Sequence, residues 1–320
     1  MARHLIGSSE CMDRLKQDIL KVGQHDGCVL ISGETGTGKE VVAEAIHKAS
    51  GRQGNFVAVN CLALPTELFE SEMFGSSKGS FTGSTATKNG LFTHARNGTI
   101  LLDEVDSIPA VFQGKLLRVI QEKRVRKVGA LDDEGATCRI LVASNADLAA
   151  KVESGSFRRD LYYRLEMFCL QVKPLRDRRE DIPALVKHIS KRRVSSECNS
   201  GGFSASAIQT LQEHDWPGNV RELENVVVRS LVMNDVSMLE PEHILFSSKP
   251  GMLRTSSGMS INLPPEGITL KEIEIEAILL VQAAFDDDIK RMAKFFQTSP
   301  ARMQKLVDRM YALLKGEELE

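Results

Sequence analysis

The sequence predicts an α/β fold in which a parallel sheet is covered by helices and is followed by a small helical domain. Short apolar runs alternate with helical stretches from about residue 10 to residue 170, the pattern of a parallel sheet whose two faces are both buried. A glycine-rich turn separates the first of these runs from the next helical stretch. After Pro174 the β signal stops and only helical patterns remain.

Five short, near-continuous apolar runs are the predicted strands. They lie at Cys28–Ser32, Phe56–Val59, Thr99–Leu102, Ile140–Ser144 and Met167–Val172. Helical periodicity between them predicts helices such as Val41–Ala49 and Val111–Glu122. Because ligands of alternating α/β folds bind outside the carboxyl ends of the strands, we expect the functional residues at that edge.

The second half of the chain is predicted to be helical. Helices are expected at Ile182–Arg193, Ser204–Glu213 and Val220–Met233, the last opened by Trp-Pro-Gly-Asn. Residues 248–268 are rich in Ser, Gly and Pro, which is typical of a linker. We therefore predict an α/β domain over residues 1–172, a helical domain over 173–247, the linker, and a further helical domain over 269–320.

The composition excludes several classes of protein. The 320 residues carry a net charge of −2, so no global basic excess indicates nucleic acid and any such contact must be local. Six scattered cysteines include no Cys-x-x-Cys pair, which argues against a zinc site or a disulfide framework. No signal-peptide core and no membrane-length apolar run is found. We expect a soluble, cytoplasmic protein without a membrane partner.

The turn after the first predicted strand matches a phosphate-binding loop. Gly33, Gly38 and Lys39 fit the pattern Gly-x-x-x-x-Gly-Lys, between a strand and a helix. In such a loop, backbone amides and the amino end of the helix bind phosphate, and the lysine adds a cation. Glu40 occupies the position that normally carries a hydroxyl for Mg²⁺. The predicted nucleotide-binding residues are Gly33, Glu34, Thr35, Gly36, Thr37, Gly38, Lys39 and Glu40, and a chance glycine-rich turn is the alternative.

The strand over Thr99–Leu102 ends in two acids, Asp103 and Glu104. Beside a phosphate loop, one acid can hold the Mg²⁺ shell and its neighbour can orient and polarise an attacking water. We assign Asp103 to Mg²⁺ and Glu104 to water activation. A strand end with solvated acids is the alternative.

Two further predicted strands end in an amide side chain, Asn60 and Asn145. An asparagine at that edge can hydrogen-bond an acid, a water or a terminal phosphate. Taken alone, each is equally compatible with a turn residue.

Three arginines are candidates for phosphate contact. Arg158 and Arg164 lie in Phe-Arg-Arg-Asp-Leu-Tyr-Tyr-Arg-Leu, and Arg221 lies in the first turn after Trp-Pro-Gly-Asn. A guanidinium donates twice and stays charged, and an arginine offered by a neighbouring subunit completes a site only in an oligomer. The alternatives are a solvated helix face for the first two and a surface arginine for Arg221.

One loop holds an apolar side chain in a polar setting. Phe81 stands within Gly-Ser-Phe-Thr-Gly-Ser, where nothing nearby continues a strand or helix pattern that would bury it. An exposed phenylalanine on such a loop predicts contact with a partner. The predicted partner-binding residues are Gly79, Ser80, Phe81, Thr82, Gly83 and Ser84, and a hairpin whose phenylalanine folds onto its own domain is the alternative.

Taken together, these motifs resemble the AAA+ ATPase domain of the sigma-54-dependent transcription activators, the bacterial enhancer-binding proteins. The resemblance is dense over residues 5–247. Its most specific part is Gly79–Ser84, which is similar to the family's Gly-Ala-Phe-Thr-Gly-Ala loop, with Ser80 and Ser84 replacing the alanines. Glu40 also fits the family, and the resemblance makes residues 1–172 the AAA+ α/β ATPase subdomain and 173–247 a small helical lid.

The resemblance implies a role for each candidate residue. Asp103 and Glu104 correspond to the Walker B acids, and Asn60 to a switch asparagine that restrains the catalytic glutamate. Asn145 corresponds to the first sensor and Arg221 to the second. Arg158 and Arg164 fall on the arginines that act on a neighbouring subunit.

The resemblance also implies a function. The chain is expected to hydrolyse ATP with Mg²⁺ as a ring, a hexamer by resemblance, built of identical or different subunits. Hydrolysis would move the Gly79–Ser84 loop against sigma-54 and convert the closed RNA polymerase complex into the open one, with upstream enhancer DNA bound. The alternatives are an AAA+ regulator or remodelling ATPase that no longer uses sigma-54, and a non-enzymatic DNA-binding regulator that uses ATP only to set its oligomeric state.

The C-terminal segment also resembles a part of this family. Residues 269–320 resemble the family's Fis-like helix-turn-helix, with a lead helix over Leu270–Ala283, a first helix over Ile289–Phe296 and a recognition helix over Pro300–Leu313. Ser299 suits the N-cap and Pro300 the first helical position. Residues 289–315 carry seven basic side chains against one acid, so we expect Arg302, Lys305 and Arg309 to face DNA. An amphipathic dimerisation helix is the alternative.

Few residues precede the AAA+ match, so the regulatory domain usual in the family is expected to be missing. Control is then expected from a separate regulatory protein or a partner subunit acting in trans, or the chain is a truncated form.

Overall fold

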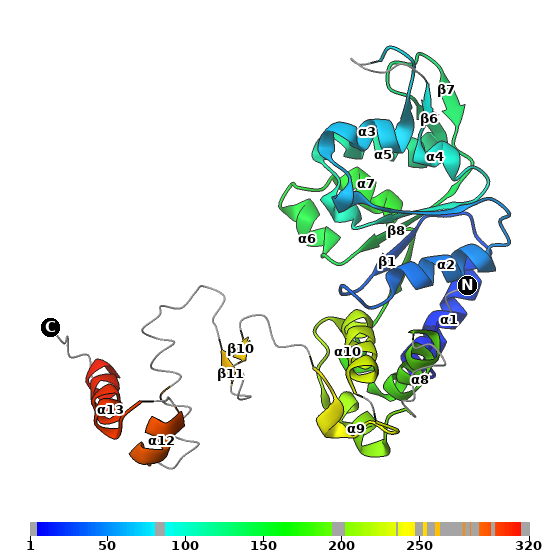
Figure 1. The fold of residues 1–320 in the computed structure, drawn as a ribbon. Coiled ribbons are helices and arrows are strands. Elements are labelled where there is room, and N and C mark those ends of the chain that lie inside the picture. Colours follow the sequence, from blue (N-terminus) through cyan, green and yellow to red (C-terminus); the bar gives the residue numbers. More distant parts are fainter. Residues whose placement is uncertain are drawn as a thin grey trace. The chain divides into compact units, whose positions relative to one another are not determined.

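A computed structural model describes residues 5–80, 87–193, 202–234, 236–246, 252–254, 260–262, 278, 282, 288–295 and 298–314. The chain forms two compact units, Met1–Leu245 and Phe246–Glu320. All predicted nucleotide-site residues belong to the first unit (Figure 1).

The first unit is built on a five-stranded sheet with the strand order β2-β5-β8-β1-β9. Every neighbouring pair in this sheet is parallel. The predicted strands are confirmed, each to within one residue at either end. Their bounds are β1 (Val29–Ser32), β2 (Phe56–Asn60), β5 (Thr99–Asp103), β8 (Arg139–Ser144) and β9 (Phe168–Gln171).

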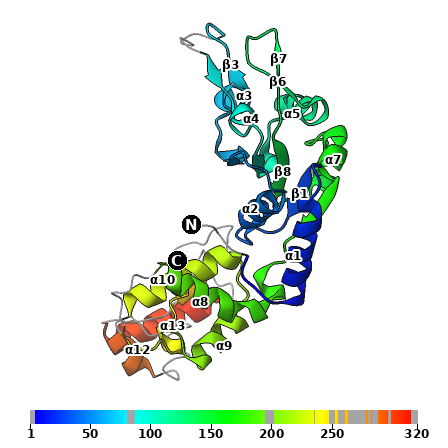
Figure 2. The ribbon, with the colours of Figure 1, turned by 90° about the vertical axis from the view of Figure 1, so that its right-hand side faces the viewer.

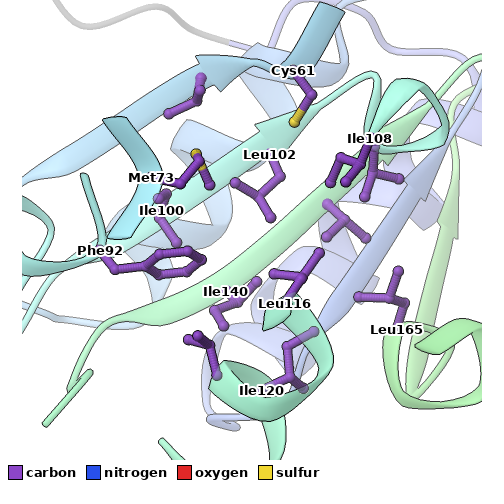
Figure 3. Close-up of a cluster of buried hydrophobic side chains, with 14 of the residues drawn as sticks. Cys61, Met73, Phe92, Ile100, Leu102, Ile108, Leu116, Ile120, Ile140 and Leu165 are labelled. Atoms are coloured by element: carbon purple, nitrogen blue, oxygen red, sulfur yellow. The ribbon is translucent and has the colours of Figure 1, made fainter. Parts of the chain in front are cut away.

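Helices cover both faces of the sheet because successive strand side chains point to opposite sides. On one face, Val29, Ile31 and Leu101 are buried in a cluster with residues of α1 and α2. On the other face, Ile100 and Leu102 pack against the remaining helices of this subdomain (Figure 3). The helices are α1 (Glu10–Gly23), α2 (Lys39–Ala49), α3 (Thr66–Phe74), α4 (Leu91–His94), α5 (Ala110–Glu122), α6 (Leu148–Glu153) and α7 (Arg159–Leu165).

Two short hairpins extend from the sheet subdomain, and the sequence analysis did not predict their strands. They are β3 (Gly75–Ser76) with β4 (Lys88–Asn89), and β6 (Arg124–Arg126) with β7 (Asp133–Gly135). Figure 2 shows them at the same end of the first unit, and the Ser77 amide donates to the Val128 carbonyl at 2.9 Å. Strands of two or three residues are too short to show an alternating pattern.

The helical lid of the first unit contains α8 (Ile182–Arg193), α9 (Ala205–Glu213) and α10 (Asn219–Met233). These helices confirm the predicted ones, and the Ser204 hydroxyl caps α9 by accepting the Ala207 amide at 3.2 Å. Trp216 is fully buried, and its indole N–H donates to the Leu211 carbonyl at 2.7 Å. Short 3₁₀ turns complete the unit: η1 (Cys61–Ala63), η2 (Val105–Ser107), η3 (Leu175–Asp177), η4 (Arg179–Asp181) and η5 (Pro241–His243).

Among the described residues of the second unit, α12 (Ile289–Phe295) and α13 (Pro300–Leu314) pack through Met292, Ala293, Met303 and Val307. These are the two helices predicted for the helix pair. Most of the predicted lead helix, Leu270–Ala283, lies outside the described residues. The segment predicted as a linker holds a short antiparallel pair, β10 (Met252–Arg254) and β11 (Ser260–Asn262). Among the described helices, none is long and apolar enough to cross a membrane.

Candidate active site at the carboxyl edge of the sheet

Four neighbouring strands bring predicted site residues to one edge of the sheet. Gly33 follows β1, Asn145 follows β8, Asp103 ends β5 and Asn60 ends β2. The order β2-β5-β8-β1 makes these strands adjacent. Since they run parallel, their carboxyl ends meet at one edge, where Asn60 and Asp103 are partners in register.

The phosphate-loop match folds as the loop between β1 and α2. Gly36 and Gly38 have φ angles of +79° and +101°, which glycine adopts without strain. A Cβ on Gly36 would lie 2.3 Å from the Gly218 carbonyl oxygen, so only glycine permits this approach of the loop to the lid. Within the loop, the Thr37 hydroxyl donates to the Glu34 carbonyl at 2.7 Å.

Lys39 begins α2 and turns back over the loop. Its ammonium donates to the carbonyl oxygens of Gly33, at 2.8 Å, and Glu34, at 3.2 Å. The side chain is buried, and this burial lowers the pKa of Lys39, while the nearby carboxylates of Asp103 and Glu104 act in the opposite direction. The cation therefore lies in the electrostatic field of both acids.

The acid pair has an unusual backbone and an unsatisfied oxygen. The Glu104 amide donates to Asp103 Oδ1 at 3.0 Å, and Glu104 has the left-handed φ of +53°. Such a conformation costs of the order of 1–3 kcal/mol and is concentrated at functional sites. Glu104 Oε2 is buried without a hydrogen-bond partner in the described chain. Because a buried polar atom without a partner is unfavourable, this oxygen suits a group supplied from outside the chain.

The same residues suit a cation that a nucleotide brings with it. Among the described residues, no three His, Cys, Asp or Glu side chains are arranged to hold a metal ion. Mg²⁺, however, is commonly held by one or two carboxylates together with substrate phosphates and water. The Asp103 carboxylate fits that donor set, which leaves the unpartnered oxygen of Glu104 free to accept a hydrogen bond from a water.

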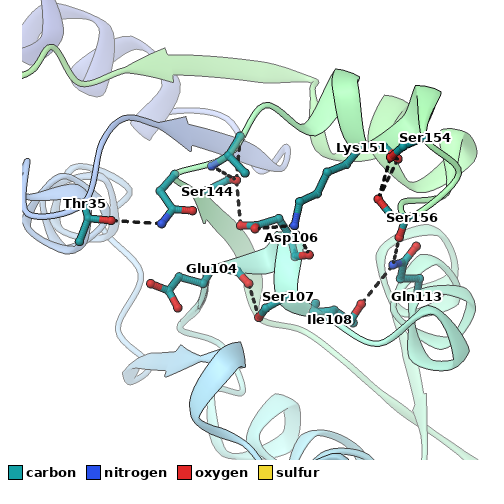
Figure 4. A network of polar contacts seen from close by, with 12 residues as sticks. Thr35, Glu104, Asp106, Ser107, Ile108, Gln113, Ser144, Lys151, Ser154 and Ser156 are labelled. Atoms are coloured by element: carbon teal, nitrogen blue, oxygen red, sulfur yellow. Dashed lines mark hydrogen bonds and ion pairs between the residues drawn. The ribbon is translucent and has the colours of Figure 1, made fainter. Parts of the chain in front are cut away.

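The two asparagines differ in what they contact. Asn145 Nδ2 donates to the hydroxyl of Thr35 at 3.1 Å and so ties the end of β8 to the phosphate loop (Figure 4). Asn60 instead caps η1, with its Oδ1 accepting the Leu62 amide at 2.9 Å and the Ala63 amide at 3.3 Å. In the described chain, no hydrogen bond joins Asn60 to Glu104.

Arg158 and Arg164 lie on α7, and no contact in the described chain joins them to the phosphate loop. Arg158 is exposed, and its guanidinium pairs with Asp160 through two contacts of 3.0 and 2.7 Å. Arg164 is exposed and forms no hydrogen bond or ion pair within the described residues. The structure therefore does not bring these two arginines to the loop of their own chain.

Arg221 lies beside the phosphate loop, in the first turn of α10. Its backbone amide donates to the Gly36 carbonyl at 3.3 Å, next to the Val220 amide at 3.0 Å. Its exposed side chain is near enough for its charge to act on the pKa of Lys39. The first turn of α10 thus rests on the loop.

The lid segment holds the loop through Asn219, a residue that the sequence analysis did not single out. Asn219 is fully buried, and its Nδ2 donates to Glu34 Oε2 and to the Thr35 carbonyl, both at 3.1 Å. Its Oδ1 accepts the Leu175 amide at 2.8 Å. Arg176 forms an ion pair with Glu34 that includes a 2.9 Å contact. Together Arg176 and Asn219 lower the pKa of Glu34 to about 2.

A buried arginine that contacts the loop, Arg178, was not predicted either. Its Nη2 donates to the Thr37 carbonyl at 3.0 Å, so it contacts the loop one residue before Gly38. In the sequence it stands within the run of charged residues Arg176–Asp181, which resembles a solvated turn.

The loop predicted to bind a partner lies at the end of the β3–β4 hairpin. Gly79 has a left-handed φ of +79°, and the Ser80 amide donates to the Ser77 carbonyl at 3.2 Å. Phe81, Thr82, Gly83 and Ser84 lie outside the described residues. The β3–β4 pair shows that a hairpin carries this loop.

The predicted DNA-facing residues lie on α13. The Ser299 hydroxyl accepts the Arg302 amide at 3.3 Å, which confirms the predicted N-cap and the start at Pro300. Arg302 and Lys305 are exposed. Arg309 belongs to α13, but its side chain lies outside the described part.

Comparison with known families decides the relationship of this chain. Residues 5–171, more than half of the chain, match the family model described as the sigma-54 interaction domain. The chain belongs to the sigma-54 activator family. Residues 176–256 of this chain also match the model of the AAA+ ATPase lid domain. The expected AAA+ fold with a parallel sheet and a lid is confirmed.

Curated relatives of this chain are longer proteins. It is 43% identical over 277 residues to the response regulator protein PilR of Pseudomonas aeruginosa, covering 86% of this chain and 62% of PilR. It is 44% identical over 244 residues to the regulatory protein AtoC of Escherichia coli, covering 75% of this chain and 53% of AtoC. The chain thus spans between half and two thirds of the length of these relatives.

Solved structures of NtrX from Brucella abortus share the architecture of this chain. The NtrX complex with ADP has a TM-score of 0.73 and 28% identity, over 96% of this chain and 69% of NtrX. The complex with ATP has a TM-score of 0.73 and 29% identity, with the same coverage.

Proposed function

We propose that this chain is an ATP-hydrolysing transcription activator that converts the closed sigma-54 RNA polymerase complex into the open one. One observation carries the proposal: Lys39, Asp103 and Glu104 converge at the carboxyl edge of the sheet, beside a glycine loop. Membership of the sigma-54 family and the ATP and ADP held by the similar NtrX structures support it.

The chemistry follows from the groups at this edge. The loop amides and Lys39 would bind the phosphates of ATP, and Asp103 would hold Mg²⁺, which neutralises phosphate charge. The Glu104 carboxylate would orient the attacking water and withdraw its proton. Its buried, unpartnered Oε2 supports this role, because that oxygen has acceptor capacity left for a water.

The other polar side chains would detect whether the terminal phosphate is present. Asn145 already contacts the loop through Thr35, and Arg221 lies beside the loop in the first turn of the lid helix. Asn60 would restrain Glu104 in one nucleotide state, although in this structure its amide oxygen caps η1. A changed contact between Asn60 and Glu104 would transmit loss of the phosphate to the rest of the subunit.

The arginines of α7 would act across a subunit boundary. Arg158 and Arg164 are exposed and have no contact with the loop of their own chain, which supports a ring in which each subunit completes its neighbour's site. We propose a hexameric ring on the family resemblance, built of one or more kinds of subunit. Mixed rings test this arrangement, because Arg158→Ala subunits should regain hydrolysis beside Glu104→Gln subunits.

The Gly79–Ser84 loop would contact sigma-54. It connects β3 with β4, and Figure 2 shows β3 beside β6 and β7 at one end of the first unit, which supports a part that contacts a partner. Phe81→Ala should leave ATPase activity within about twofold, since Phe81 is not one of the residues assigned to the ATP site, and should abolish open-complex formation in transcription with purified sigma-54 polymerase. If the variant still opens promoters, the loop is not the sigma-54 contact.

The second unit would bind enhancer DNA as a helix-turn-helix. The packing of α12 on α13 and the exposed Arg302 and Lys305 support this assignment, and Arg309 is proposed as a third contact. A Lys305→Glu variant should weaken DNA binding more at low salt than at high salt, since the loss of a phosphate contact makes the dependence of the affinity on salt shallower. Equal affinity of the variant and the parent in a salt series would contradict the assignment.

An ATPase assay combined with sigma-54 transcription tests the proposal as a whole. Glu104→Gln should bind ATP but not turn it over, while the exposed Glu153→Gln should behave like the parent. The alternative, an AAA+ ATPase that no longer uses sigma-54, is favoured by the two serines that replace alanines at Ser80 and Ser84. It predicts ATP hydrolysis without open-complex formation on any sigma-54 promoter.

A further inference from the structure

Gln113 is a buried polar residue that none of the assigned roles uses. It lies on α5 and is 1% exposed. Its Oε1 accepts the backbone amide of Arg158 at 2.9 Å. Its Nε2 donates to the carbonyl oxygens of Ile108 and Ser156, both at 3.1 Å. One side-chain amide therefore joins η2, α5 and the chain that enters α7.

Lys151 also binds the segment that leads into α7. Its ammonium donates to the Asp106 carbonyl at 3.0 Å and to Asp106 Oδ2 at 2.9 Å. Its own carbonyl accepts the amides of Ser156, at 3.0 Å, and Phe157, at 3.1 Å. Figure 4 shows Lys151 extended between Asp106 and the turn at Ser154 and Ser156. The residues just before Arg158 are thus fixed at two points.

Asp106 connects this arrangement to the candidate active site. It lies two residues after Glu104, and its Oδ1 accepts the hydroxyl of Ser144 at 3.0 Å. Ser144 is the last residue of β8, directly before Asn145. A continuous set of hydrogen bonds therefore runs from the edge of the sheet to Arg158, the N-cap of α7.

We propose that Gln113 is a positioning residue that sets where α7 begins and so places Arg158 for the nucleotide of a neighbouring subunit. The inference rests on the proposed function, in which Arg158 acts in trans. Arg158 is the N-cap of α7, where a backbone amide has no partner within the helix. Because Gln113 binds that amide and not the guanidinium, it fixes the backbone while the side chain can leave Asp160 and reach outward.

Gln113→Met tests the proposal, because methionine has a similar length but neither donates nor accepts at this site. The matched control is Gln121→Met, the same change at an exposed position of the same helix. In rings of the full chain, kcat for ATP hydrolysis should fall by about 100-fold, the effect expected of a catalytic group displaced by about an ångström. The affinity for ATP should stay within about twofold, because the phosphate loop is not touched.

Mixed rings separate positioning from a general loss of structure. Gln113→Met subunits have an intact loop and acid pair, so Glu104→Gln subunits, whose arginines are correctly placed, should restore hydrolysis to them. Arg158→Ala mixed with Glu104→Gln is the reference. If the reference recovers and the Gln113→Met mixture does not, the inference is wrong. If neither recovers, the trans arginine of the proposed function is wrong.

A second variant keeps the test decisive if Gln113→Met does not fold. Lys151→Met removes the contact with Asp106 at a side chain that is 35% exposed, which the fold tolerates more easily. It should show the same pattern, with a lower kcat, unchanged affinity for ATP and recovery beside Glu104→Gln. Full activity of either variant in unmixed rings would overturn the proposal.

Discussion

Replacing Asn219 should separate the lid from the phosphate loop. Asn219 is fully buried and makes three hydrogen bonds, with Glu34, Thr35 and Leu175. Each bond to a backbone group contributes about 1 kcal/mol to the free energy of unfolding. The bond to Glu34 is also assigned about 1 kcal/mol. The Glu34 side chain is 42% exposed, and solvent weakens the electrostatic interactions of its carboxylate.

The backbone adds a second contribution. Asn219 has a left-handed φ of +54°, which costs about 1 kcal/mol more for alanine than for asparagine. Asn219→Ala should therefore lower the free energy of unfolding by about 4 kcal/mol, and Asn219→Gly by about 3 kcal/mol, since glycine adopts this φ freely. The difference between the two variants isolates the backbone contribution.

The assay is urea unfolding followed by the fluorescence of Trp216, the single tryptophan of the chain, which is buried in the lid. The control is Asn225→Ala, an exposed position in the middle of α10, where the change should be near zero or slightly stabilising. A loss below about 1 kcal/mol for Asn219→Ala would refute the reasoning, because each bond alone accounts for that much.

Three further predictions follow from the same loop. The pKa of Glu34 is about 2 in the folded protein, against an ordinary value of 4.5, so its ion pair stabilises the fold above pH 4.5 and is lost as the pH falls towards 2. The difference in unfolding free energy between parent and Glu34→Gln should therefore narrow over that range in urea titrations; a constant difference would contradict this. Lys39→Ala should abolish ATP binding in calorimetry, and unchanged affinity would exclude the phosphate-loop assignment. Gly36→Ala should lower the free energy of unfolding by about 1–3 kcal/mol more than Gly51→Ala, because both positions have positive φ but only Gly36 faces the Gly218 carbonyl.

The parts of the fold that the sequence predicted correctly are those with continuous local patterns. The apolar runs Val29–Ile31 and Ile140–Ala143 lie in strands that are buried on both faces, so every residue in them is apolar and the run is unbroken. Lys39, Asp103 and Glu104 could be predicted because each immediately follows such a strand or its loop. Their order along the chain already places them at one edge of a parallel sheet.

The residues that the sequence did not reveal act through contacts distant in the chain. Asn219 contacts residues about 185 positions away, and a glycine followed by asparagine at a helix start resembles an ordinary cap. Gln113 lies on the buried face of α5, where its partner Arg158 is 45 residues away. A periodic sequence pattern cannot show that a buried side-chain amide has three hydrogen-bond partners. Asn219 and Gln113 can therefore be identified only from the folded structure.

The carbonyl oxygens of the phosphate loop, from Gly33 to Gly38, all accept hydrogen bonds from within the protein. Lys39 takes those of Gly33 and Glu34, Asn219 takes that of Thr35, and the first amides of α10 take that of Gly36. Arg178 and the amides of Val41 and Val42 take the last two, at Thr37 and Gly38.

Six consecutive acceptors are therefore occupied before a nucleotide arrives, half of them by donors from the lid and its connecting segment. An anion approaching this loop meets amide hydrogens and an ammonium without competing oxygen dipoles. Because these donors from the lid and its connecting segment cover three of the six oxygens, we expect loss of the lid to weaken phosphate binding even with every residue of the loop unchanged.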